Sequence, residues 1–239
     1  MKIHLIDGEK GGVGKSWVAF TIAEYLRSQP IPFYLYAADR SNPTAASRYR
    51  DKQQYADFYD GSVHYTQFSE NVKKLDEPDV LLEMALQRTV VLDLPAQVHY
   101  PLTSWIAQKD IFPLSKANQI DWVRWFVCNG EDDSIQILIA SAPFYQGRPT
   151  VLVRNWGLCD DWDYFDEHEE LQATINKYRI VVIDFPKLAD SKRIKINANR
   201  WTFEEAMELG NFGLVGKSDI YKYTQKAYRV LASTHLLEV

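Results

Sequence analysis

A glycine-rich segment near the start of the chain constrains its fold more than any other feature. The segment Lys10–Ser16 reads KGGVGKS and lies between an apolar run, Ile3–Ile6, and an amphipathic stretch, Lys15–Ser28. An apolar run that leads into glycines and then into a helical pattern predicts a strand, a tight loop and a helix. The sequence therefore predicts a phosphate-binding loop, in which backbone N–H groups and the start of the helix face the phosphates of a nucleotide.

The side chains of this loop supply the expected chemistry. Lys15 is expected to reach the β- and γ-phosphates of ATP, and the Ser16 hydroxyl is expected to hold Mg²⁺. The predicted cofactors are therefore ATP and Mg²⁺. The cofactor-binding residues expected in this segment are Lys10, Gly11, Gly12, Val13, Gly14, Lys15, Ser16 and Trp17.

The rest of the chain alternates short apolar runs with longer amphipathic segments. Several runs are apolar throughout, which is typical of strands covered on both faces of a parallel sheet. The pattern predicts an α/β fold with a doubly wound, mainly parallel sheet flanked by helices. The expected strands are Ile3–Ile6, Phe33–Tyr36, Thr89–Leu92, Val151–Val153 and Ile180–Ile183, with further short candidates at Val63–Phe68 and Asp110–Pro113. The expected helices are Lys15–Ser28, Asp79–Gln87, Leu102–Gln108, Asn118–Val127, Glu167–Lys177 and Phe203–Leu209, whereas Ser134–Ala140 fits either a strand or a helix.

Composition narrows the class of protein. With 239 residues, of which 46% are hydrophobic, the chain can bury a sizeable core, and we expect a single domain over residues 1–239. We find no stretch approaching 18 apolar residues, no signal peptide and no basic amphipathic helix at the C-terminus. These observations predict a cytoplasmic protein that does not bind membranes.

The loop also departs from the ordinary phosphate-loop pattern. That pattern has a glycine at the position of Glu9, and this chain adds a second lysine, Lys10. The arrangement resembles the deviant phosphate loop of the ParA/MinD family of partition and positioning ATPases. The resemblance implies an ATP-dependent homodimer in which Lys10 reaches the nucleotide of the partner subunit, while Lys15 contacts the nucleotide bound to its own subunit. A second cation would neutralise charge that develops on the transferred phosphate, so Lys10 and Lys15 are both predicted to be catalytic.

The resemblance continues at two aspartates. The family has an Asp-x-Asp pattern after its second strand, and this chain has Ala37 at the first position and Asp39 at the second. Asp39 is therefore expected to help place Mg²⁺ and the attacking water. Asp93 ends the run Thr89–Asp93 and matches the aspartate behind the Mg²⁺-bound water. The segment Leu94–Gln97 would then sense the γ-phosphate.

Two later residues resemble the part of the family's site that holds the base. Asn155 follows the run Val151–Val153 and matches an asparagine near the adenine. Pro186 follows Ile183-Asp184-Phe185 and matches a proline whose neighbouring backbone frames the base. An amide can both donate to adenine and accept from it, which suits Asn155 to this place.

Charge is distributed unevenly along the chain. The net charge is −5, yet residues 187–229 carry nine Lys or Arg against five Asp or Glu. A basic surface that is doubled in a dimer could hold DNA without reading its sequence, and Lys192, Arg193 and Lys195 are the expected contacts. A solvated helix face would explain the same pattern.

Three functions fit this sequence. The first is a switch for plasmid or chromosome partition, with slow ATP hydrolysis that a protein partner stimulates and with non-specific DNA as a further ligand. The second is an accessory ATPase of plasmid mobilisation that acts on a protein partner. The third is an ATP-dependent metabolic ligase on the same scaffold. A metal-cluster reductase is disfavoured, because Cys128 and Cys159 form no ligand pair at short spacing.

Overall fold

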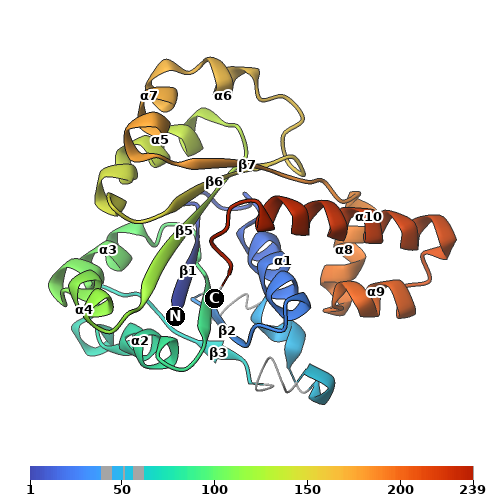
Figure 1. Ribbon diagram of the computed structural model, residues 1–239, viewed down its shortest axis with the longest axis horizontal. Coiled ribbons are helices and arrows are strands. Elements are labelled where there is room, and N and C mark those ends of the chain that lie inside the picture. Colours follow the sequence, from blue (N-terminus) through green and yellow to red (C-terminus); the bar gives the residue numbers. More distant parts are fainter. Residues whose placement is uncertain (39–44, 51, 56–61, 239) are drawn as a thin grey trace.

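A parallel sheet of seven strands forms the centre of the computed structural model, which describes residues 1–38, 45–50, 52–55 and 62–238 (Figure 1). The strand order is β3-β2-β4-β1-β5-β6-β7, and neighbouring strands in the described part of the chain pair in parallel. Because β1 lies in the middle and the chain builds outward to both edges, the predicted doubly wound sheet is confirmed. The strands are β1 (Lys2–Asp7), β2 (Phe33–Ala37), β3 (His64–Tyr65), β4 (Thr89–Asp93), β5 (Asp121–Cys128), β6 (Thr150–Asn155) and β7 (Val181–Phe185).

Helices cover both faces of this sheet (Figure 1). One face packs against α1, α8, α9 and α10 in a core that includes Val91, Trp125 and Val153. The other face carries two further clusters, one with α2, α3 and α4 and one with α5, α6 and α7. The described helices are α1 (Lys15–Ser28), α2 (Val80–Ala85), α3 (His99–Gln108), α4 (Ile111–Ala117), α5 (Asp132–Ser141), α6 (Asp163–Glu167), α7 (Glu169–Tyr178), α8 (Asp190–Asn199), α9 (Phe203–Leu209) and α10 (Gly213–Ala232).

The helix expected over Asn118–Val127 is wrong, because the structure forms the strand β5 there. This strand lies between β1 and β6, and its side chains alternate between the cores on the two faces. Trp125 enters the core beneath α1, whereas Phe126 enters the core beneath α5. Because apolar side chains lie on both faces, β5 lacks the two-residue alternation that marks a half-exposed strand, and its sequence pattern does not distinguish it from a buried helix.

The short strand expected at Asp110–Pro113 is also wrong, because the segment begins the helix α4. Pro113 occupies the first turn, where its missing N–H group costs no helical hydrogen bond. Ile111 and Phe112 are buried in the core that contains α2 and α3. Tertiary burial, rather than local preference for an extended chain, therefore decided this element.

The remaining differences concern the lengths of predicted elements and two helices that the sequence did not predict. The segment Ser134–Ala140, which fitted either element, lies in the helix α5. The strand expected over Val63–Phe68 is reduced to the two residues of β3. The helices α8 and α10 were not predicted, although both pack beside α1. In the part of the chain that the structure describes, no helix has the length and apolar character needed to cross a membrane.

Parallel topology places the loops after β1 and β4 next to each other. The N–H of Leu94 donates to the carbonyl of Ile6 at 3.2 Å, and the N–H of Gln97 donates to that of Glu9 at 3.1 Å. Because the carboxyl ends of parallel strands meet at one edge, this edge is where a ligand is expected to bind.

Candidate nucleotide-binding site

The loop between β1 and α1 has a backbone that only glycine can adopt at two positions. Gly8 has a φ of +151°, and a Cβ there would lie 2.8 Å from the carbonyl oxygen of Val127. Gly14 caps α1 with a φ of +97°, and a Cβ there would lie 2.4 Å from Nδ2 of Asn155. Since the cap residue is a glycine, it has no side chain to cover the N–H groups of the first helical turn. The loop therefore has the features of an anion-binding helix start.

Lys15 is held inside this loop. Only 8% of the residue is exposed, and its ammonium donates to the carbonyl oxygens of Gly8 and Lys10, the latter at 2.9 Å. Burial lowers the pKa of Lys15, while the carboxylates of Asp7 and Asp93 oppose this shift. A desolvated ammonium interacts strongly with an anion that replaces its water, as a phosphate would.

A cavity of about 430 Å³ opens beside the loop. This volume lies in the range of sites for small ligands. Three parts of the fold besides the loop build its walls: the end of β2, the segment after β4 and the helix α8. Its lining residues are Gly11, Gly12, Val13, Gly14, Lys15, Ser16, Trp17, Ala37, Asp93, Leu94, Pro95, Ala96, Arg193 and Asn197.

The oxygen donors in this cavity fit Mg²⁺ bound together with a nucleotide. The hydroxyl-bearing Ser16 is half-buried, Asp93 is 5% exposed, and both line the cavity. Among the described residues, no group of three or more His, Cys, Asp and Glu side chains could hold a metal alone. Mg²⁺ at nucleotide sites usually needs only one or two protein ligands, because phosphates and water supply the others. Asp39, the other predicted metal ligand, lies outside the described residues, and Ala37 contributes only a methyl group to the wall.

Asn155 and Pro186 lie together beside the loop, in a small recess that Gly14 and Trp17 also line. The amide of Asn155 is buried, and its Nδ2 donates to the carbonyl of Val13 at 2.8 Å. Its Oδ1 accepts from the N–H of Gly157 at 3.0 Å. The amide thus ties the end of β6 to the phosphate loop, a function that the sequence did not reveal.

Lys10 points to a different partner from Lys15. Its ammonium forms an ion pair with Glu131 and lies 3.5 Å from Asp133, at the start of α5. The hydrogen bond that Lys10 donates to Glu131 raises the pKa of Lys10 and lowers the pKa of Glu131. Both side chains are accessible, since 34% of Lys10 and 57% of Glu131 is exposed. The second lysine of the motif is therefore a charged side chain at the surface.

Glu9, which replaces the usual glycine, joins the loop to its neighbours. Its carboxylate accepts from the N–H of His99 at 2.6 Å, at the first residue of α3. Its carbonyl accepts from the N–H of Gln97. In the sequence, Glu9 is recognisable only as a departure from the ordinary phosphate-loop pattern. In the structure, Glu9 connects the phosphate loop to the segment expected to sense the γ-phosphate.

The three residues predicted to contact DNA all lie on α8, and each binds another group of the same chain. Lys192 pairs with Asp219 at 3.1 Å, and Lys195 donates to the carbonyl of Gly210 at 2.6 Å. Arg193 pairs with Asp190 at 2.8 Å and lines the cavity beside the phosphate loop. The structure thus places Arg193 at the wall of this cavity, with 32% of its side chain exposed.

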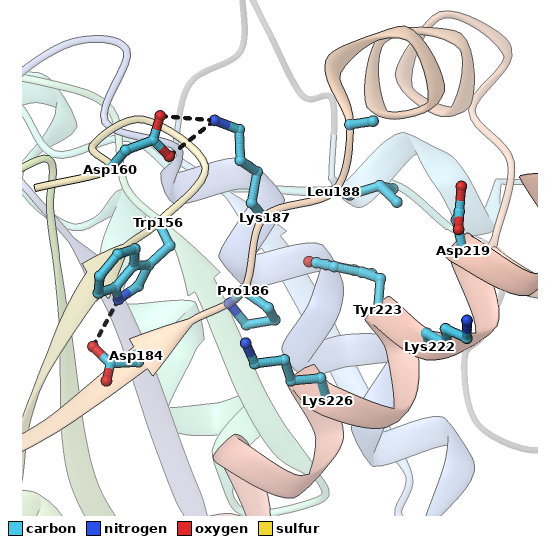
Figure 2. Close-up of a pocket in the computed structure, with 11 residues that line it drawn as sticks. Trp156, Asp160, Asp184, Pro186, Lys187, Leu188, Asp219, Lys222, Tyr223 and Lys226 are labelled. Atoms are coloured by element: carbon cyan, nitrogen blue, oxygen red, sulfur yellow. Dashed lines mark hydrogen bonds and ion pairs between the residues drawn. The ribbon is translucent and has the colours of Figure 1, made fainter.

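A second cavity, of about 580 Å³, lies between the ends of β6 and β7 and the helix α10 (Figure 2). Lys187 closes one side through its ion pair with Asp160, and the indole of Trp156 donates to Asp184 (Figure 2). Lys222 and Lys226 are exposed along α10 and also line this cavity. Pro186 lines both this cavity and the recess beside the phosphate loop, so the two are neighbours.

The strand order and the glycine-rich loop between β1 and α1 define a P-loop α/β protein. Within this class, the chain has the fold of MinD. The cell division ATPase MinD of Pyrococcus furiosus is 15% identical with a TM-score of 0.52, over 95% of this chain and 98% of that chain. MinD of Aquifex aeolicus is 12% identical with a TM-score of 0.50, over 95% of this chain and 96% of that chain. The matched chain of the MinC:MinD complex of Aquifex aeolicus is 11% identical to this chain. The TM-score is 0.50, and the match covers 95% of each chain. No family model and no curated protein matches the sequence.

Proposed function

We propose that this chain is an ATPase switch of the ParA/MinD type that binds Mg-ATP, dimerises and hydrolyses ATP to drive plasmid or chromosome partition or the positioning of a cargo. The observation that carries this proposal is the buried ammonium of Lys15 inside a glycine loop, at the wall of a cavity sized for a small ligand. Electrostatic stabilisation of phosphates by such a loop is the main catalytic contribution in phosphoryl transfer.

Each loop residue has a separate role in the proposal. Lys15 binds the β- and γ-phosphates, and Ser16 and Asp93 hold Mg²⁺, which neutralises charge on the phosphates when it is bound. Asp39 positions the attacking water. Leu94, Pro95 and Ala96 line the cavity beside Asp93, where a segment that responds to the γ-phosphate is needed.

Lys10 acts across a dimer interface in this proposal. Its side chain is accessible and is held by Glu131 and Asp133 of its own chain. Exposed ion pairs contribute little to stability, because water and salt screen them. Exchanging these carboxylates for a phosphate of the partner's nucleotide therefore costs little.

Two alternatives differ from a partition switch in what is bound besides ATP. An accessory ATPase of plasmid mobilisation would act on a protein partner, and one of the MinD structures with this fold is a complex with MinC. We propose that a protein partner binds this chain and stimulates its hydrolysis of ATP. An ATP-dependent ligase would need a second substrate site, and the cavity beside α10 is one place for it.

The oligomeric state of the chain tests this proposal. We expect a monomer with ADP and a dimer with a non-hydrolysable ATP analogue, both in the presence of Mg²⁺, measured by sedimentation at low salt. Addition of a non-specific DNA duplex should then distinguish a partition function from action on a protein partner. Co-sedimentation of DNA with the dimer supports partition, and a dimer without bound DNA supports action on a protein. A monomer in both nucleotides would contradict the dimer switch.

A further inference from the structure

Arg193 lies where the phosphate-loop cavity meets the neighbouring recess. It lines the cavity together with Lys15 and Ser16, and it lines the recess together with Asn155 and Pro186. Among the described residues that line the cavity, Lys15 and Arg193 are the cations. A nucleotide with its phosphates on the loop and its sugar toward the recess would have its α-phosphate on the side of this guanidinium.

The helix that carries Arg193 is fixed against the helix that begins at the phosphate loop. Arg48 is 1% exposed and donates to the carbonyls of Ile196 and Trp201 and to Oδ1 of Asn197. Its guanidinium lies 3.9 Å from the centre of the Phe20 ring on α1. This buried arginine therefore couples α8 to α1 through hydrogen bonds and ring contact.

The orientation of α8 follows from this attachment. Arg193 and Asn197 are four residues apart, so they lie on the same side of the helix. Asn197 both accepts from Arg48 and lines the cavity. The bond that anchors Asn197 therefore also directs Arg193 toward the cavity.

The guanidinium of Arg193 is not fully occupied. Its Nε and Nη2 both donate to the same carboxylate oxygen of Asp190, at 3.1 and 2.8 Å. The side chain is 32% exposed, and among the described residues Nη1 has no hydrogen-bond partner. An accessible pair of this kind is weak, because solvent screens it. An arginine can bind a phosphate oxygen through two parallel N–H groups, which makes phosphate a strong competitor for Asp190.

We propose that Arg193 is a nucleotide-binding residue whose guanidinium binds the α-phosphate, and that this bond replaces its pair with Asp190. The proposal rests on the proposed function, since it needs a nucleotide on the phosphate loop. The α-phosphate is common to ADP and ATP, so Arg193 supports both nucleotides equally. It differs in this respect from Lys10, whose expected partner is the transferred phosphate.

Calorimetric titration with Mg-ADP and with a non-hydrolysable Mg-ATP analogue tests this assignment on the full chain. Arg193→Ala should weaken both nucleotides by a similar factor of roughly ten to a hundred, as expected for lost hydrogen bonds to a charged group. Arg193→Lys should retain part of the affinity, because it keeps the charge but not the planar fork. Asp190→Asn should bind both nucleotides at least as tightly as the parent.

The matched control is Arg229→Ala, which removes an exposed arginine from α10 and should leave both affinities unchanged. Added guanidinium should partly restore nucleotide binding to Arg193→Ala but should not affect the control. A folded Arg193→Ala chain that binds both nucleotides like the parent overturns the assignment of Arg193. If Lys15→Ala still loses binding in that case, the proposed function stands. A parent chain that binds neither nucleotide refutes the proposed function itself.

Discussion

Lys15→Ala is expected to abolish measurable binding of ATP and ADP. The substitution removes the buried ammonium that faces the cavity, and hydrogen bonds to charged groups contribute about 1.5–3 kcal/mol each. Loss of two such bonds corresponds to at least a hundredfold weaker affinity. If the parent binds with a micromolar dissociation constant, binding to the variant would be too weak to measure by calorimetry. Titration of the parent and the variant with each nucleotide measures the effect.

Two further variants separate phosphate binding from loop structure. Lys15 also donates to the carbonyls of Gly8 and Lys10, so its removal could disturb the loop itself. Lys15→Gln keeps an N–H donor but has no charge, and it should fail to bind nucleotide while melting near the parental temperature. Lys116→Ala, at an exposed position of α4, should bind like the parent. Unchanged ATP affinity in Lys15→Ala would exclude this loop as the phosphate site.

Lys10→Ala is expected to leave ATP binding nearly intact and to lower turnover by about 10³–10⁵, the range known for a cation supplied in trans to phosphoryl transfer. The reason lies in the position of the side chain, which pairs with Glu131 outside the cavity and so adds little to binding in its own subunit. ATP-dependent dimerisation should weaken as well. Phosphate release and sedimentation with the ATP analogue measure the two effects.

The carboxylates that hold Lys10 provide the control for this variant. Glu131→Gln combined with Asp133→Asn releases the lysine without removing it. This double variant should hydrolyse ATP at least as fast as the parent and should dimerise at equal or lower protein concentration. If Lys10→Ala dimerises and hydrolyses ATP like the parent, the lysine serves only its ion pairs at α5.

The parts of the fold that could be predicted are those that local pattern determines. The strand β1, the glycine loop and the helix α1 follow one another within residues 2–28, and each has its own signal. The strand β5 could not be recognised in this way, because it is buried on both faces at the centre of the sheet. The helix α4 contains Pro113 and has few turns, so its burial against α2 and α3 decided its structure.

In the candidate site, too, the residues of a local motif could be predicted, whereas a residue placed by tertiary contacts could not. Lys15 and Ser16 belong to one contiguous motif, so the sequence was sufficient to place them next to each other. Arg193 reaches the same cavity from α8, and its direction depends on Arg48, which lies far from it in sequence. From the sequence alone, residues 187–229 are recognisable only as a basic segment. This composition cannot distinguish a nucleotide contact from a DNA contact.

The rate of phosphate release from Mg-ATP, measured for the parent chain over a wide range of protein concentrations, tests the proposed ATPase switch most directly. If Lys10 acts on the nucleotide of a second copy, the rate per molecule must rise with protein concentration until the dimer is saturated. The rise should require Mg²⁺ and should be absent in Lys10→Ala and Lys15→Ala. No release of phosphate at any concentration, or a rate per molecule that is constant throughout the range, would contradict the proposal.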